Sequence, residues 1–131
     1  MNKEKTIAAL FDFDGVVMDT EAQYTQFWDA IGNVYYPEIE NFGHHIKGQS
    51  LKELYKNYFG ETEGLQDYIT GKLLEFEEQI HFEYIAGAAA FMKSLKERGV
   101  KVAIVTSSSD SKMANAYRAH PELLTMTDCI V

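Results

Sequence analysis

The sequence feature that most constrains the fold is the run TIAALF, residues 6–11, which leads directly into the acidic turn DFDG. A short continuous apolar run fits a β-strand that is covered on both faces, although periodicity alone would also permit a buried helix. The turn signal Asp14-Gly15 after the run favours the strand. Two carboxylates, Asp12 and Asp14, are therefore expected where a buried strand leaves the core.

Bulk composition fits one globular domain that binds neither nucleic acid nor membranes. The chain has 131 residues, of which 46% are hydrophobic, and a formal net charge of −8. It contains no cluster of lysine or arginine that could bind nucleic acid or an anionic membrane. Cys129 is the only cysteine, and the N-terminal apolar stretch is too short to span a bilayer. From these features we expect a cytoplasmic protein.

Helical periodicity dominates residues 20–82. The first helix has an aromatic face and is expected to end at Gly32. Ser50 and Glu53 form a capping box that predicts a second helix. A third helix is predicted within residues 64–82, because apolar residues recur there every three or four positions.

After residue 82 the pattern alternates between helix and strand. A helix with Phe91, Met92 and Leu95 facing inward precedes an apolar strand at residues 100–105. Ser109 or Asp110 can cap the next helix, and a third strand begins at the C-terminus. These elements predict an α/β fold in which residues 1–19 and 83–131 form a partial, Rossmann-like parallel sheet core and residues 20–82 a helical insertion.

Three interpretations of the acidic turn compete. An EF-hand calcium loop is excluded, because glycine follows Asp14 directly and Gln23 occupies the twelfth position, where glutamate is required. An ordinary solvated turn is the commoner role of an isolated motif of this kind. Phosphoryl chemistry is the third, since carboxylates at the carboxyl end of a strand can bind Mg²⁺ and supply a nucleophile and a proton donor.

The segment after the second strand helps to decide among these three interpretations of the acidic turn. It ends in VTSSSD, so that Thr106 and Ser107 precede a helix start, where hydroxyl and backbone N–H groups suit a phosphate. A serine-rich capping loop would be the ordinary interpretation of this segment alone. The two motifs together favour phosphoryl chemistry.

LFDFDGVVMDT followed by VKVAIVTSSSD resembles the haloacid dehalogenase superfamily, in particular its phosphatase and β-phosphoglucomutase-like branch with a helical cap. The resemblance covers the whole chain. It implies that Asp12 is the nucleophile that forms an aspartyl-phosphate, and that Asp14 is the general acid and base. Both residues would contribute to a Mg²⁺ site, Asp14 through its backbone carbonyl, and Thr106 would bind the transferring phosphate. Residues 20–82 would be a cap over a small phosphorylated metabolite, with a sugar phosphate among the candidates.

The cap sequence HIKGQSLKEL separates phosphatase from mutase. It resembles the mutase segment that grips a sugar phosphate, but Leu51 replaces the arginine of that segment, and Tyr24 replaces a histidine of the first cap helix. Both departures favour a phosphatase over a phosphosugar mutase. Lys47 can still reach a substrate anion, although an ordinary surface lysine is the more frequent case.

The family also has a lysine after the third strand and acids after the fourth, and no residue before Val131 fits these positions. Lys112 is expected to be a solvated helix residue. We therefore expect a fragment with little or no turnover and an exposed apolar strand edge through which it can self-associate. A non-catalytic binding or self-assembling module is the alternative from another class.

Overall fold

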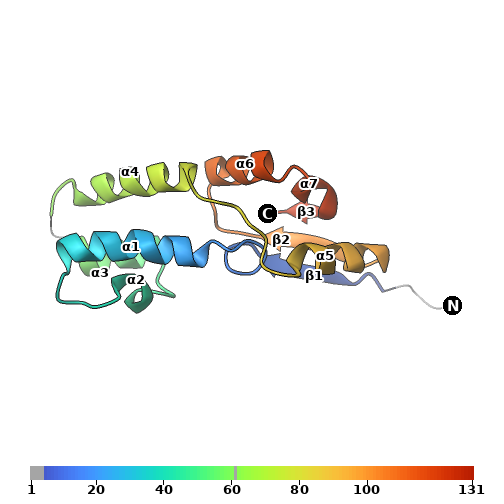
Figure 1. The fold of residues 1–131 in the computed structure, drawn as a ribbon, viewed down its shortest axis with the longest axis horizontal. Coiled ribbons are helices and arrows are strands. Elements are labelled where there is room, and N and C mark those ends of the chain that lie inside the picture. Colours follow the sequence, from blue (N-terminus) through green and yellow to red (C-terminus); the bar gives the residue numbers. More distant parts are fainter. Residues whose placement is uncertain (1–4, 61) are drawn as a thin grey trace. The chain divides into compact units, whose positions relative to one another are not determined.

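The computed structural model describes residues 5–60 and 62–131, so the first four residues of the predicted core and residue 61 of the helical insertion lie outside the described part. The chain divides into two compact units. One unit is formed by Met1–Thr20 together with His81–Val131, and the other by Glu21–Ile80. Figure 1 labels the elements of both units. Among the described residues, no helix combines the length and the apolar character needed to cross a bilayer.

The first unit contains the parallel sheet that the sequence predicts. Its strands β1 (Ala8–Asp12), β2 (Lys101–Val105) and β3 (Cys129–Ile130) are ordered β1-β2-β3, and both pairs are parallel. The last residues of the first two strands, Asp12 and Val105, are partners in register. The carboxyl ends of these strands therefore meet at one edge of the sheet.

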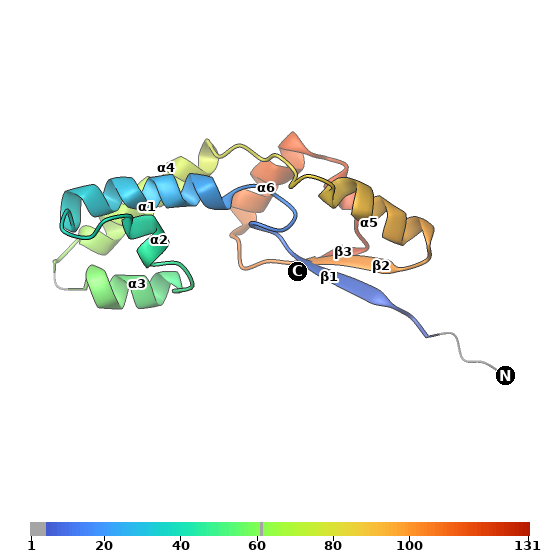
Figure 2. The ribbon, with the colours of Figure 1, turned by 60° about the horizontal axis from the view of Figure 1, so that its bottom comes forward.

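Three helices accompany the sheet: α5 (Ala88–Glu97), α6 (Asp110–Ala119) and the short α7 (Leu123–Met126), which the sequence did not predict. Figure 2 shows α5 and α6 on the same side of the sheet. Met92 on α5 is fully buried, as expected, but Phe91 is 53% exposed. The expectation that Phe91 faces inward was therefore wrong: its ring meets the Phe11 ring edge-on, with the centroids 6.0 Å apart, and about half of the residue stays in contact with solvent.

Leu10 and Val105, on the sheet face opposite the buried side chains of β2, remain exposed. The sequence predicted self-association through an exposed strand edge. β1 is an outer strand in the described sheet, and self-association through its edge stays a prediction.

The described residues of the second unit form the helices α1 (Glu21–Tyr35), α2 (Phe42–His45), α3 (Leu51–Tyr58) and α4 (Leu65–Glu78) and their connections. The predicted capping box is present at the start of α3. The Ser50 hydroxyl accepts from the Glu53 N–H, and the Glu53 carboxylate accepts from the Ser50 N–H. The buried side chains form one core and come from all four helices and the segments next to them: Trp28, Ile31, Phe42, Ile46, Leu54, Phe59 and Ile69.

Gly32 does not end the first helix, as the sequence suggested, but lies inside it. Helix α1 continues to Tyr35, and Gly32 is buried. A Cβ atom at position 32 would lie only 2.3 Å from the Phe42 Cβ and 2.5 Å from its Cγ. Glycine is present because it lets Phe42 pack directly against the backbone of α1.

Gly32→Ala is expected to lower the free energy of unfolding by about 1–3 kcal/mol, because Phe42 must move out of a packed core. Gly71→Ala is the matched control, since the same change in α4 meets no atom within 4 Å. It should stabilise the protein by roughly 0.5–1 kcal/mol through helix propensity. Urea unfolding followed by circular dichroism measures both changes, and equal effects of the two substitutions would contradict the packing role of Gly32.

Candidate functional site

The site begins at Asp12, the last residue of β1. The Asp12 side chain is exposed, and its Oδ1 accepts a hydrogen bond of 2.8 Å from the Phe13 backbone N–H. This bond orients the carboxylate. Asp12 is thus an oriented, accessible carboxylate at the carboxyl edge of a parallel sheet, where open α/β sheets bind their ligands.

A tight turn follows Asp12 and is held by its own backbone. The Phe13 carbonyl accepts from the N–H groups of Val17 and Met18, each at 3.0 Å, and the Gly15 N–H donates to the Met18 carbonyl at 2.8 Å. Gly15 has a φ of 76°, a left-handed conformation that glycine adopts without strain. Phe13, Val17 and Met18 are fully buried. The turn therefore presents Asp14 from a fixed backbone.

Three side chains converge on the Asp14 carboxylate. The Lys112 ammonium donates to Oδ1 at 2.8 Å and to Oδ2 at 2.7 Å. The Thr20 hydroxyl donates to Oδ1 at 2.6 Å, and the Ser108 hydroxyl donates to Oδ2 at 3.2 Å. Both carboxylate oxygens are thus occupied by donors from separate segments of the chain.

The expectation that Lys112 is a solvated helix residue was wrong. Lys112 is 2% exposed, and its ammonium lies 6.0 Å from the centre of the Phe13 ring. The partner of Lys112 is 98 residues distant in sequence, so no local pattern identifies it. One feature of the sequence could have indicated an acidic partner for Lys112. Lys112 lies in the first turn of α6, where the helix dipole disfavours a cation unless an acid compensates it.

The loop after β2 supplies the hydroxyl groups that the sequence singled out. The Thr106 hydroxyl donates to the Ser108 hydroxyl at 2.9 Å and accepts from the Ser108 N–H at 3.1 Å. Ser109 caps α6 through its hydroxyl, which accepts from the Lys112 N–H. Local hydrogen bonds therefore order this loop before any ligand binds.

The structure brings three of the predicted residues to one hollow. Asp12, Thr106 and Ser107 line an open cavity of about 500 Å³ with Leu10, Phe11 and Val105. Asp14 contacts the same loop through Ser108. The lining of this hollow thus combines one carboxylate residue with two hydroxyl residues.

The described residues contain no cluster of three or more His, Cys, Asp or Glu side chains that could hold a metal ion. Mg²⁺ needs fewer protein ligands, because it commonly binds one or two carboxylates together with water and phosphate oxygens. Asp12 fits this requirement through its exposed carboxylate. The Asp14 carboxylate does not fit, since Lys112, Thr20 and Ser108 occupy both of its oxygens, so Asp14 could contribute only through its main chain.

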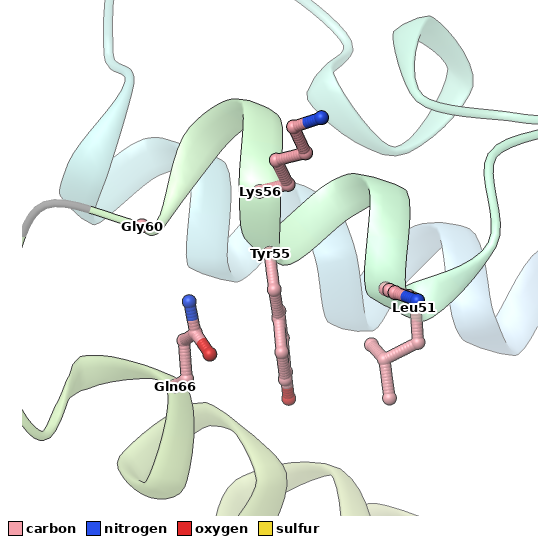
Figure 3. A pocket seen from close by; sticks show the side chains of 6 residues that line it. Leu51, Tyr55, Lys56, Gly60 and Gln66 are labelled. Atoms are coloured by element: carbon pink, nitrogen blue, oxygen red, sulfur yellow. The ribbon is translucent and has the colours of Figure 1, made fainter.

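Lys47 lies in the helical unit, in the turn after α2, and is exposed. This unit has a separate open hollow of about 770 Å³ between α3 and α4, lined by Leu51, Lys52, Tyr55, Lys56, Gly60 and Gln66. Figure 3 shows Tyr55 and Gln66 pointing between the helices and Lys56 pointing away. The Tyr55 hydroxyl shares a hydrogen bond of 2.5 Å with Thr70, and burial raises the pKa of Tyr55 above its usual value. Tyr55 is therefore bound into the packing of the helical unit.

Solved structures with the same fold come from several organisms. A protein from Bacteroides fragilis described as a haloacid dehalogenase-like hydrolase has a TM-score of 0.74 at 16% identity, covering 97% of this chain and 63% of that one. A predicted phosphatase from Clostridium acetobutylicum has a TM-score of 0.69 at 22% identity, with coverages of 98% and 61%. A hydrolase of the same family from Deinococcus radiodurans, solved with bound phosphate and sodium, has a TM-score of 0.63 at 21% identity, with coverages of 96% and 57%.

The present chain thus spans about three fifths of the length of these solved proteins. No curated protein matches its sequence. The sequence family of haloacid dehalogenase-like hydrolases matches residues 9–128, which include the turn with Asp12 and Asp14 and the loop with Thr106. With the parallel sheet, the paired strand ends and this match in agreement, the chain belongs to the haloacid dehalogenase-like hydrolase family.

Proposed function

We propose that this chain carries the phosphoryl-transfer site of a Mg²⁺-dependent phosphohydrolase that acts on a small phosphorylated metabolite. The observation that supports this proposal most directly is the hollow shared by Asp12, Thr106 and Ser107 at the joined ends of two parallel strands. The phosphate bound to the Deinococcus radiodurans hydrolase shows that a protein with this fold can hold the relevant anion. We also propose that the protein is cytoplasmic, as expected from its single cysteine.

In the proposed first step, an oxygen of the Asp12 carboxylate forms a bond to phosphorus while the bond from phosphorus to the leaving oxygen breaks. The leaving oxygen takes a proton from the Asp14 carboxyl group, which must be protonated at this point, and the phosphoryl group remains on Asp12 as an aspartyl-phosphate. The hydroxyl groups of Thr106 and Ser107 would hold the phosphoryl oxygens, since the Thr106 N–H already donates to the Val131 carbonyl. Bound Mg²⁺ would supply positive charge that offsets the repulsion between carboxylate and phosphate.

In the proposed second step, water attacks phosphorus and the bond to the Asp12 oxygen breaks, which releases inorganic phosphate and restores the carboxylate. Asp14 would accept the proton of the attacking water. Because both Asp14 oxygens accept hydrogen bonds in this structure, one donor must move when Asp14 takes or gives a proton.

Chemical trapping tests the first step on the 131-residue chain itself. The chain is incubated with Mg²⁺ and phenyl phosphate, treated with borohydride, which reduces an aspartyl-phosphate to homoserine, and analysed by peptide mass spectrometry. We expect homoserine at position 12, dependent on both the phosphate ester and Mg²⁺. No reduction at position 12, or equal reduction without the ester, would contradict the proposal.

Hydrolysis is favoured over mutase activity, since Leu51 and Tyr24 replace the arginine and histidine of the mutase pattern. Both residues belong to the packed helical unit. Leu51 begins α3, and the Tyr24 hydroxyl donates to the Glu77 carboxylate at 2.5 Å. Product analysis with hexose 1-phosphates separates free phosphate from a transferred phosphoryl group.

A further inference from the structure

Lys112 lies at a position where its charge costs free energy in two ways, and its contact with Asp14 compensates for both. A charged group that is almost completely buried is costly unless a partner compensates it, and Lys112 is 2% exposed. The first turn of α6 is also the position where the helix dipole opposes a cation. The close contact of its ammonium with both oxygens of Asp14 compensates for both costs.

This contact also decides where the Asp14 side chain can lie. An ammonium that bridges both oxygens at 2.7 and 2.8 Å is a stronger constraint than the Ser108 hydroxyl, which meets one oxygen at 3.2 Å. Lys112 comes from α6, Ser108 from the loop after β2 and Thr20 from the segment after the acidic turn. One carboxylate thus joins three segments of the sheet unit.

We propose that Lys112 is a positioning residue that holds the Asp14 carboxylate in one rotamer for the phosphoryl-transfer reaction. This inference rests on the proposed function, because Asp14 is the acid and base of that reaction. Lys112 itself acts through Asp14. Its ammonium constrains the proton-transferring group, and its loss should affect the rate of the chemical step more than binding of the ester.

The single cysteine of the chain permits a direct test. Cys129 is exposed in β3 and can be replaced with serine, so that Lys112→Cys introduces one unique thiol. Alkylating this thiol with 2-bromoethylamine in the unfolded state and refolding the protein restores an ammonium on a side chain of lysine length. Alkylation with iodoacetamide gives a neutral amide as the matched control.

Two measurements are made on the Cys129→Ser parent and on both alkylated forms. Three-bond NMR couplings report whether Asp14 has one χ1 rotamer or averages over several, without any need for activity. Trapping with phenyl phosphate gives the limiting rate of capture at Asp12 and the half-saturating ester concentration. Circular dichroism confirms that each form has refolded.

We expect a single Asp14 rotamer in the parent and in the ammonium form, and averaging in the amide form. The limiting rate of the amide form should fall roughly 10- to 100-fold, with the half-saturating concentration within about twofold of the parent, and the ammonium should restore the rate. Averaged couplings in the parent, or an unchanged rotamer and rate in the folded amide form, would overturn the role of Lys112. Failure of the parent to capture phosphate would count against the proposed function, while the couplings would still decide the positioning role.

Discussion

Replacing Asp12 with asparagine should lower phosphoryl capture by roughly a thousandfold or more, because the amide lacks the nucleophilic carboxylate oxygen. The fold should be retained. Asparagine can keep an oxygen that accepts the hydrogen bond from the Phe13 N–H, and the side chain is exposed. The measurement is the initial rate of trapping at position 12 with phenyl phosphate and Mg²⁺, compared with release of phenol in the same samples.

Glu97→Gln is the matched control for Asp12→Asn. It makes the same change from acid to amide at an exposed residue of the first unit, at the end of α5, which precedes the amino end of β2. It removes the same charge from the protein, so it controls for the general effect of net charge on binding an anionic ester. Phenol release that exceeds the protein-free background and is equally fast in Asp12→Asn and the unmodified chain would show that Asp12 is not the nucleophile.

Asp14→Ala should destabilise the protein by roughly 3 kcal/mol, near the lower end of the cost of breaking a buried ion pair, because the buried Lys112 ammonium loses both carboxylate oxygens that it contacts. Lys112→Met should cost less, about 1–2 kcal/mol, since Asp14 keeps the Thr20 and Ser108 hydroxyls and its side chain is 30% exposed to water. Urea unfolding measures the free energy of each variant.

The double variant Asp14→Ala with Lys112→Met should lose less stability than the two single variants together. The loss should fall short of their sum by roughly 1–3 kcal/mol, because both charges of the pair are removed. Glu75→Ala is the control for an exposed pair. Glu75 lies 3.6 Å from Lys72 with both side chains well exposed, and its removal should change stability by less than about 0.5 kcal/mol. Additive effects of the two site substitutions would contradict an energetic coupling between Asp14 and Lys112.

Features of this protein that depend on near neighbours in sequence could be predicted. The capping box at Ser50 was predicted, and Ser109 was one of two candidate caps for α6, because in both cases a hydroxyl reaches an N–H only three residues away. The parallel order of β1 and β2 followed from the strand signals and the intervening helix. The contribution of Asp12 and Thr106 to one hollow then followed, because parallel strands end at the same edge.

Features that depend on distant residues could not be predicted. Gly32 has the local character of a helix end, but Phe42 packs over it and α1 continues to Tyr35. The four-residue helices α2 and α7 have too few residues for a recognisable period. Each of these outcomes was set by packing between segments.

The fold class and the chemical groups at the strand ends follow from the amino-acid order alone, because an apolar strand followed by DFDG and a second strand followed by TSSSD place carboxylates and hydroxyls at adjoining strand ends. The arrangement of those groups depends on contacts between distant segments. These contacts leave Asp12 accessible, enclose Asp14 among donors from three segments, and bury Lys112 where the sequence suggests a solvated side chain. The energy of a buried charge depends on the groups within hydrogen-bonding distance, and Asp14, which contacts the Lys112 ammonium, is 98 residues away in the chain.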